Sequence, residues 1–346
     1  MPITIAALRE SAAGERRVAI TPETAKKYAS RGMRVLLQRG AGESAGFPDA
    51  AYAGVEFADA PSVAGQADLL LCVQPPSDVA TSSMKEGAAL IGQLRPHSAA
   101  DRLATYASRK LAAFSLELLP RTTRAQAMDV LSSQAAVAGY RAMLIAAEAA
   151  PKFFPMLTTA AGTLRPSKVL VIGAGVAGLQ AIATARRLGA MVEGFDVRPE
   201  TREQIESLGA KFLDLGVSAK GEGGYARELT AEERAAQQAE LNEVIGGMDI
   251  VITTAQVPGR KPPVLVTADA VARMKPGSVL VDMAASPLGG NVELSKAGET
   301  IVTANGVTII APDNLPATMP AGSSAFYARN ISTLLLGMVR DGALHL

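Results

Sequence analysis

Three glycines with a fixed spacing are the residues of this sequence best suited to recognising a ligand. They read Gly173-x-Gly175-x-x-Gly178, after the apolar run 169–172 and before a helix-like segment that starts at Leu179. Such glycines permit a tight turn, let backbone approach a pyrophosphate, and let the helix pack closely on the strand. The free amides and the dipole at the helix start favour an anion. The pattern predicts a dinucleotide-binding turn; a glycine-rich turn of some other α/β domain is the alternative.

An acidic residue stands where the ribose of such a cofactor needs one. A second strand-like run, Met191–Phe195, ends in Asp196, which lies 18 residues after Gly178. A carboxylate at this place accepts both ribose hydroxyls and repels a 2′-phosphate. Arg198 acts in the opposite sense, because an arginine beside the acid attracts a 2′-phosphate. Asp196 comes first, so we expect NAD(H) rather than NADP(H).

Composition limits the class of protein. The 346 residues suggest two domains, and the 34 basic and 33 acidic residues nearly cancel, which gives no sign of a nucleic-acid partner. The single cysteine, Cys72, allows no intramolecular disulfide and lies in the apolar run 69–73, so we expect a buried side chain and a reducing compartment. The N-terminus does not resemble a signal sequence, and no 18 consecutive uncharged apolar residues suggest a membrane span. A cytoplasmic protein is expected.

Short apolar runs alternate with helical segments, which is typical of parallel sheets covered by helices. Thr21 followed by Pro22 predicts a capped helix start, a long apolar helix is expected over 125–149, and the last helix, 324–338, is expected to return to the first lobe. The expected strands are 3–7, 35–38, 69–73, 89–91, Ala112–Ser115, 249–253, Val279–Asp282 and Thr308–Ile310.

These elements predict an α/β protein of two Rossmann-like lobes with parallel sheets and NAD(H) in the cleft between them. We expect the first lobe to comprise residues 1–134 plus 318–346, and the NAD(H)-binding lobe residues 135–317. Within the second lobe, about 216–230 is polar and glycine-rich, and we expect a mobile loop there or a plain insertion. Tyr225 follows a double glycine and is the residue best placed to close onto a cofactor.

Several sequence blocks together resemble one family, the proton-translocating nicotinamide nucleotide transhydrogenases, and specifically their NAD(H)-binding component. The resemblance extends from about residue 3 to 335. The Arg-Ala-Gln-x-Met-Asp block is its specific part, whereas the opening block and the glycine turn are shared with the related alanine dehydrogenases. The blocks are Glu-Arg-Arg-Val-Ala-Ile-Thr-Pro at 15–22, Arg-Thr-Thr-Arg-Ala-Gln-Ala-Met-Asp-Val-Leu-Ser-Ser-Gln at 121–134, Ala-Gly-Tyr-Arg-Ala at 138–142, Asp-Val-Arg at 196–198, Gly-Gly-Tyr at 223–225 and Thr-Thr-Ala-Gln-Val-Pro-Gly at 253–259.

The resemblance implies that the 121–134 block surrounds the nicotinamide end of the cofactor. Arg121 and Ser132 have donors for the carboxamide or the phosphates, and Asp129 can accept from the amide or orient Arg121. Gln126 is the candidate for steering the ring during transfer. An ordinary ion pair of Arg121 with Asp129 at a helix start is the alternative. The backbone of Arg121, Thr122 and Thr123 is expected to line the site.

The remaining implied residues hold the adenosine end or close over the cofactor. No metal ligands are expected. The adenosine side comprises Gly173, Gly175, Val176, Gly178, Asp196, Val197 and Arg198, and the closure positions are Gly224, Tyr225, Gln237 and Gln256. One departure from the family pattern is Ser286, where we expect a carboxylate before Gly289-Gly290.

Alanine dehydrogenases are the rival, and two positions argue against them. Their substrate lysine is matched here by Gln74 and their histidine by Arg95. Oxidative deamination needs a proton acceptor with a pKa near neutrality, but Gln74 does not titrate and Arg95 stays protonated. His97 could take the role only if a shift of two residues, about 6–7 Å along a strand, were tolerated.

Transhydrogenation is compatible with the absence of this lysine and histidine, because hydride passes between two nicotinamide rings and no proton moves at the reacting carbons. The resemblance implies transfer from NADH, bound by this chain, to NADP⁺ on a partner domain, coupled to proton translocation by a separate membrane domain. It also implies a homodimer, to which 135–150 could contribute, and peripheral attachment to the inner membrane through partner subunits. A non-catalytic NAD(H)-binding protein is a further alternative.

Overall fold

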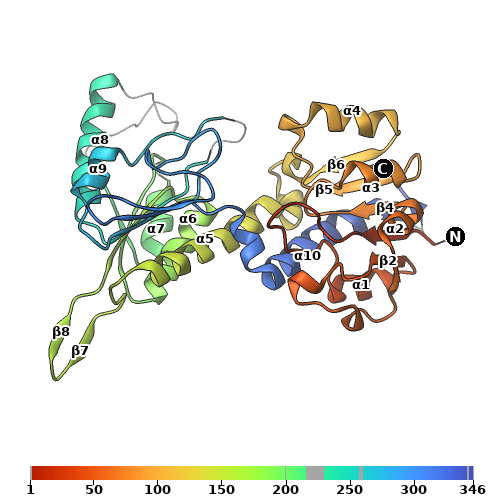
Figure 1. The fold of residues 1–346 in the computed structure, drawn as a ribbon, viewed down its shortest axis with the longest axis horizontal. Coiled ribbons are helices and arrows are strands. Elements are labelled where there is room, and N and C mark those ends of the chain that lie inside the picture. The colour runs from red at the N-terminus through yellow and green to blue at the C-terminus, as the bar shows by residue number, and fades with distance from the viewer. Residues whose placement is uncertain (1, 199, 216–229, 257–259, 341–342, 346) are drawn as a thin grey trace. The chain divides into compact units, whose positions relative to one another are not determined.

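The chain forms two compact units. In this computed structural model, residues Met1–Ala135 and Pro316–Leu346 make the first unit and Ala136–Leu315 the second (Figure 1). The expected loop at about 216–230, with Gly224 and Tyr225, lies outside the described residues except for Thr230. The structure describes residues 2–198, 200–215, 230–256, 260–340 and 343–345.

A six-stranded sheet forms the centre of the first unit, and every pair of neighbouring strands in it is parallel. Ile5 of β1 lies between Val35 of β2 and Leu69 of β4. In spatial order the strands are β3 (Glu56–Ala58), β2 (Arg34–Gln38), β1 (Thr4–Ala7), β4 (Leu69–Leu71), β5 (Ala89–Gly92) and β6 (Ala112–Ser115). This is a Rossmann-like order, and the parallel sheet predicted from the alternating pattern is confirmed.

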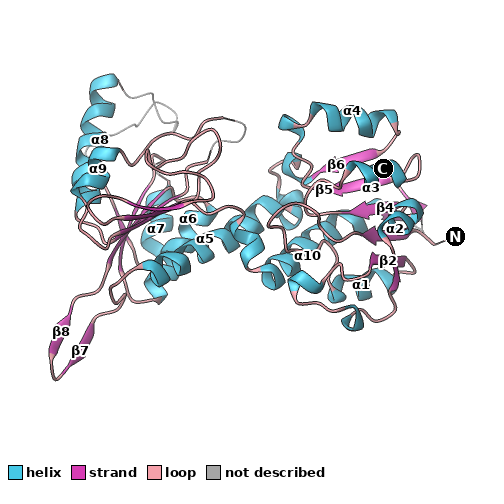
Figure 2. Ribbon diagram, viewed as in Figure 1, coloured by secondary structure: helices cyan, strands magenta, loops and turns pink. Residues whose placement is uncertain are grey.

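Helices cover both faces of this sheet (Figure 2). One buried cluster joins alternate strand residues to Tyr28 of α1 and to Tyr327 and Ile331 of α10, and a second joins the intervening ones to α2 and α4. Thr21 caps α1 in a capping box, as predicted. The helices are α1 (Pro22–Ala29), α2 (Ala60–Gln66), α3 (Asp78–Ser83), α4 (Ala100–Ser108) and α10 (Pro320–Met338), with 3₁₀ turns η1 (Glu43–Ala45), η2 (Asp49–Ala51), η3 (Pro96–Ser98), η4 (Leu116–Leu118), η5 (Thr123–Met128) and η7 (Leu315–Thr318), and the short strands β16 (Val339–Arg340) and β17 (Ala343–Leu344).

The second unit is built on a seven-stranded sheet that is parallel except where β14 meets β15. α5 and α6 pack on one face, whereas α8 and α9 pack on the other. The strands in spatial order are β11 (Lys211–Phe212), β10 (Met191–Phe195), β9 (Lys168–Ile172), β12 (Ile250–Thr253), β13 (Val279–Asp282), β15 (Thr308–Ile310) and β14 (Thr300–Val302). The helices are α5 (Val130–Ala149), α6 (Val176–Arg187), α7 (Thr201–Ser207), α8 (Ala231–Gly246) and α9 (Ala268–Arg273).

The long helix expected over 125–149 is two elements. Thr122 caps the 3₁₀ turn η5, which ends at Met128, and α5 begins only after Asp129. The Asp129 carboxylate accepts from the backbone amide of Ser132 at 3.0 Å, which is an N-cap interaction. The expected single helix was wrong because an aspartate inside an apolar helical pattern starts a new helix here.

A β-hairpin stands apart from both sheets. β7 (Leu157–Thr159) pairs with β8 (Gly162–Leu164), and every residue of the two strands is exposed. It projects from the second unit (Figure 2). Hairpins of two strands are only marginally stable alone in water, so this one needs further contacts.

By length and composition alone, α5 is long and apolar enough to cross a membrane, and a third of its apolar 18-residue stretch is buried within the protein. Ala138, Ala142 and Ala146 of α5 lie in the core cluster of the second unit. The spacing of four residues marks the side that packs on this core, so α5 serves as a core helix.

Candidate dinucleotide site

The glycine turn links β9 to α6 in the second unit. Gly173 has a φ of 98°, which favours glycine, and a Cβ on Gly178 would lie 1.8 Å from the Gly173 carbonyl oxygen. Gly175 is exposed, with nothing within 4 Å of the position of a Cβ. None of the described side chains caps the start of α6, so the first amides of this 12-residue helix remain available. The start of α6 therefore has the free amides that the predicted pyrophosphate site requires.

Asp196 closes the other side of this turn. Its Oδ2 accepts from the Ala174 amide at 2.7 Å, and Arg198 donates to both carboxylate oxygens at 2.9 Å. Burial alone would raise the pKa of Asp196, but the hydrogen bonds from Arg198 and Ala174 hold it below its ordinary value. The group is therefore an anion at neutral pH, as an acceptor of ribose hydroxyls must be. Arg198 is its partner here, with half of the side chain exposed.

Two apolar side chains lie open near these groups. Val176 opens α6 and is 45% exposed, and Val197 follows Asp196 and is 60% exposed. Their open methyl groups offer an apolar surface that suits a flat aromatic base. Both were predicted to flank the adenosine end.

A buried polar group that the sequence did not single out shapes the loop after β12. Asn291 is fully buried, accepts from the Ala255 amide and donates to the carbonyl oxygens of Ala255 and Pro263. Thr254 donates to the Gly173 carbonyl oxygen at 3.1 Å, which ties this loop to the glycine turn. The sequence offered one signal for this role: Asn291 directly follows Gly289-Gly290, in the segment after the predicted strand Val279–Asp282.

The predicted closure and edge positions show no common centre among the described residues. Gln256 is exposed and donates to the Met283 carbonyl oxygen, and Gln237 is a half-exposed residue of α8. Ser286 forms a small turn with Gly289, whose carbonyl oxygen accepts from the serine hydroxyl. The buried carboxylate of this region is Asp282 instead, and it accepts from Thr253, Ala284, Val292 and Ser295.

The predicted nicotinamide-end residues lie in the first unit, around the junction of η5 with α5. Asp129 and Ser132 contact each other, with the serine hydroxyl 2.6 Å from Asp129 Oδ2. The side chains of Arg121 and Gln126 are exposed and make no hydrogen bond or ion pair with any described residue. The alternative of an Arg121–Asp129 ion pair is not found, because the carboxylate serves the helix start.

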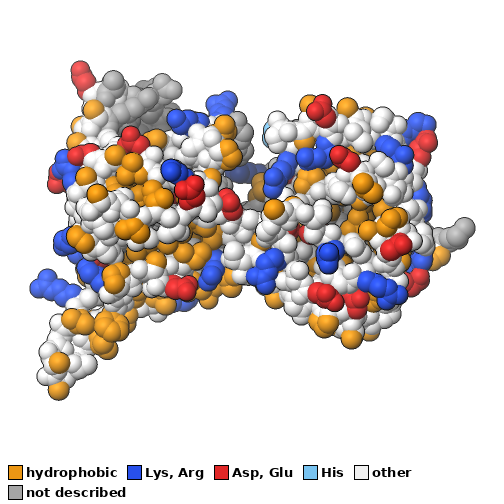
Figure 3. Space-filling model, in the orientation of Figure 1, with side chains coloured by type: hydrophobic (Ala, Val, Ile, Leu, Met, Phe, Trp, Pro, Cys, Tyr) orange, Lys and Arg blue, Asp and Glu red, His pale blue; other side chains and the backbone are white. Residues whose placement is uncertain are grey.

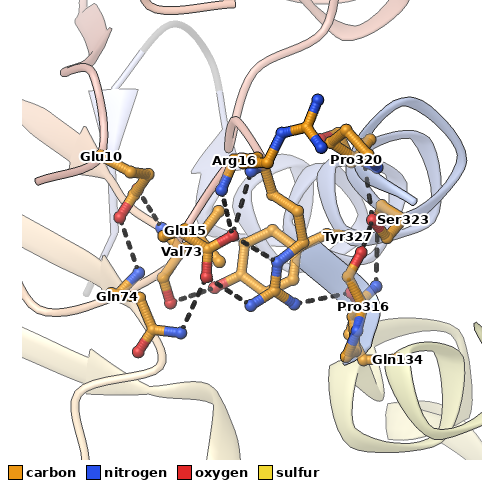
Figure 4. A network of polar contacts seen from close by, with 12 residues as sticks. Glu10, Glu15, Arg16, Val73, Gln74, Gln134, Pro316, Pro320, Ser323 and Tyr327 are labelled. Carbon is orange, nitrogen blue, oxygen red and sulfur yellow. Dashed lines mark hydrogen bonds and ion pairs between the residues drawn. The ribbon is translucent and has the colours of Figure 1, made fainter. Parts of the chain in front are cut away.

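A buried ion pair lies beside Gln74, one of the two positions at which this chain departs from the alanine dehydrogenase pattern (Figure 4). Glu15 and Arg17 are almost fully buried, and the guanidinium donates to both carboxylate oxygens at 2.7 and 2.8 Å. Gln74 donates to Glu15 at 3.0 Å and accepts from Arg95 at 2.8 Å. His97, the residue considered above as a substitute proton acceptor, is exposed.

Glu10 lies beside this network. Its two oxygens accept from the backbone amides of Val73 and Gln74 at 2.6 and 3.0 Å. Burial raises the pKa of Glu10 to about 7 in spite of these amides and of Arg17, which lower it. Cys72 is buried nearby, as predicted, and burial raises the pKa of its thiol.

Two protein-family models match this chain. The model described as "Alanine dehydrogenase/PNT, N-terminal domain" matches residues 6–138, and the model described as "Alanine dehydrogenase/PNT, C-terminal domain" matches residues 142–345. The chain belongs to the alanine dehydrogenase/PNT family. The two matches together cover nearly the whole chain.

Within this family the chain is more similar to the matching transhydrogenases than to the matching alanine dehydrogenases. It is 44% identical to the first segment of NAD(P) transhydrogenase subunit alpha of Rickettsia prowazekii (strain Madrid E), covering 98% of this chain and 90% of that protein. The solved transhydrogenase of Sinorhizobium meliloti has a TM-score of 0.88 at 43% identity, covering 97% of this chain and 93% of that one. The alanine dehydrogenase of Mycolicibacterium smegmatis (strain ATCC 700084 / mc(2)155) is 32% identical over 95% of this chain and 85% of its own. The predicted resemblance to the NAD(H)-binding component of transhydrogenase and the predicted Rossmann-like fold are confirmed.

Proposed function

We propose that this chain binds NAD(H) and passes hydride between it and NADP(H) held by another transhydrogenase domain. The observation that carries the proposal is the pairing of Gln74 with Glu15 and Arg95, which occupies the positions where a dehydrogenase needs a free cation and a proton acceptor. A reaction that moves only a hydride needs neither.

The second unit offers the groups that the adenosine and pyrophosphate require. The uncapped amides of α6 suit the pyrophosphate, the open surface of Gly175 lets it approach, and the ionised Asp196 suits the ribose hydroxyls. When bound, NADH supplies the hydride. Arg198 donates to both carboxylate oxygens of Asp196, so the ribose hydroxyls must replace these hydrogen bonds when the cofactor binds.

The first unit offers the groups for the nicotinamide end. Arg121 and Gln126 carry donors that no described residue uses, so they can bind and orient the carboxamide. Asp129 and Ser132 fix the start of α5 beside them. Their task is orientation, since hydride transfer needs two rings held within about 3–3.5 Å.

The rival amino-acid dehydrogenase is disfavoured by Gln74 and Arg95, whose side chains hydrogen-bond each other at 2.8 Å. Neither supplies a proton acceptor with a pKa near neutrality. Glu15 and Arg17 do not discriminate, because the opening block that contains them is shared with alanine dehydrogenases. Glu10 has a pKa near neutrality, yet both its oxygens hold backbone amides.

The Rickettsia relative is one segment of an alpha subunit, which implies further transhydrogenase components. We infer that this chain works with an NADP(H)-binding domain and with a membrane domain that moves protons. Its own place is then the cytoplasmic side of the inner membrane, reached through those partners.

We further infer a homodimer formed through the β7–β8 hairpin and the open side of α5. Met156, Leu157 and Leu164 are 65%, 38% and 53% exposed, and hydrophobic side chains gather at the base of this hairpin in Figure 3. Leu131 and Tyr140 of α5 are also exposed. Apolar side chains concentrated on a hairpin that cannot be stable alone favour a second protein surface as their cover.

The test of the function is reconstitution. Mixed with an NADP(H)-binding transhydrogenase domain, NADH and NADP⁺, the chain should produce NADPH, whereas the chain alone should bind NADH with little turnover. Consumption of NADH with pyruvate and ammonium by the chain alone would establish the dehydrogenase instead. Normal NADH binding without any transfer, and no effect of Gln126→Ala, would point to a non-catalytic NAD(H)-binding protein.

A further inference from the structure

One side chain of α10 bridges the break between η5 and α5. Asn330 Nδ2 donates to the Ala127 carbonyl oxygen at 2.8 Å, and Asn330 Oδ1 accepts from the Ser133 hydroxyl at 2.7 Å. Ala127 neighbours Gln126, and Ser133 neighbours Ser132. A single amide therefore joins the segment that carries Gln126 to the helix turn that carries Ser132.

The two sides of the break are not equally held. α5 is also fixed by Gln134, which accepts from Arg17 and donates to the Ser323 carbonyl oxygen at 3.1 Å (Figure 4). In contrast, Asn330 is the one described side chain from another element that hydrogen-bonds the backbone of η5. A 3₁₀ turn has weaker internal hydrogen bonds than an α-helix, so this bond matters for its position.

We propose that Asn330 is a positioning residue for hydride transfer, which sets the place of Gln126 relative to Asp129 and Ser132. This inference rests on the proposed function. Asn330 is not one of the predicted cofactor contacts, and it acts through the backbone of Ala127. Misplacement of an orienting group by about 1 Å can cost on the order of 10²-fold in rate, because transfer depends steeply on geometry.

The decisive variant is Asn330→Asp. Aspartate keeps an acceptor for Ser133 but loses the donor to the Ala127 carbonyl oxygen, so only the tie to η5 is broken. We expect single-turnover transfer from NADH to NADP⁺, with the NADP(H)-binding domain present, to slow by about 10–100-fold. The Kd for NADH should change little, because the groups proposed for its adenosine end lie on the second unit.

Two variants separate positioning from folding. Ser133→Ala removes the other hydrogen bond of Asn330 and should slow transfer less, because Gln134 still holds α5. Arg329 neighbours Asn330 on α10 and forms a surface ion pair with Glu23 of α1. Arg329→Ala breaks that pair and should leave the transfer rate unchanged. Thermal melting of all three variants shows whether stability alone is affected.

The outcomes distinguish the two levels of inference. Wild-type NADH binding without transfer would overturn the proposed function. Wild-type transfer that persists unchanged in Asn330→Asp would overturn the role of Asn330 alone. Parallel losses of Tm, NADH affinity and rate in Asn330→Asp would also overturn it, since they indicate a structural role only.

Discussion

At the scale of single residues, two carboxylates of this chain have opposite consequences for binding. Glu15 is buried with Arg17 and cannot exchange its partner without leaving a buried charge. Asp196 is also largely buried, but its partner Arg198 has half of its side chain in solvent and can move away. The first pair is thus a permanent component of the core, whereas the second can yield its oxygens to a ligand.

Replacement of Asp196 should weaken NADH binding selectively. Asp196→Asn removes the charge and one acceptor for ribose hydroxyls, and hydrogen bonds to charged groups contribute about 1.5–3 kcal/mol, so we expect a Kd about 10- to 100-fold higher. Titration by NADH fluorescence measures this. Glu193→Gln, on the strand β10 that leads to Asp196, is the matched control and should bind as the wild type. An unchanged Kd for Asp196→Asn would remove this residue from the site.

Glu10 should make stability depend on pH in an unusual direction for a carboxylate. Burial raises its pKa from 4.5 to about 7 in the folded state. The folded chain then binds more protons than the unfolded one, so the free energy of unfolding falls as pH rises between these values. Urea unfolding between pH 5 and pH 8 should show a drop in the wild type that Glu10→Gln lacks. Equal pH profiles for the two proteins would contradict it.

At the scale of elements, the first turn of α6 is positioned by direct helix contact. A Cβ on Gly139 of α5 would lie 2.0 Å from the Ala177 carbonyl oxygen, which is closer than any side chain allows. Glycine at this position lets α5 press on the start of α6, where the pyrophosphate is proposed to bind. The geometry of the anion site therefore depends on a residue that contacts no cofactor.

Gly139→Ala should displace the start of α6. Overpacking of this kind costs about 1–3 kcal/mol, so both the Tm and the NADH affinity should fall. Gly322→Ala in α10 is the control, because nothing lies within 4 Å of its Cβ position. A Gly139→Ala protein that melts and binds NADH as the control does would show that α6 is placed by other contacts.

The sequence was most informative where the spacing of the apolar residues and the residues that begin or end an element point to the same boundaries. β10 and β13 end where their apolar runs end, and the capping box at Thr21 is present as written in the sequence. It was least informative where strands lack buried residues or where a helix is interrupted. The strands β3 and β14 contain no buried residue and gave no apolar signal. Asp129 caps a helix through the backbone amide of Ser132, within a segment that otherwise reads as one helix.

The candidate site divides in the same way. The glycine turn and Asp196 were predicted because their spacing follows from the cofactor that they fit. Asn291 and Asn330 were not predicted, since each bonds backbone groups far away in the sequence. A single sequence does not show which backbone carbonyl a polar side chain will meet.

At the scale of the whole molecule, the exposed apolar hairpin predicts the state of association. Leu164→Asp places a charge in the proposed interface, where its desolvation opposes association, so we expect the wild type to be a dimer and the variant a monomer. Light scattering coupled to gel filtration measures both masses. Val302→Asp, at another exposed apolar residue of the second unit, should remain a dimer. A monomeric wild type, or a dimeric Leu164→Asp protein, would contradict the proposed interface.

The return of α10 to the first unit also sets an order of events during synthesis. Tyr327, Ile331 and Leu335 complete the buried cluster that begins with Ile5 and Tyr28. The ribosome therefore makes all of residues 136–315 before it makes the helix that covers this early sheet. The second unit has a continuous sequence and can fold first, while the N-terminal strands wait with one apolar face open. Nascent chains of this protein are expected to need protection of their oldest residues until the last helix emerges.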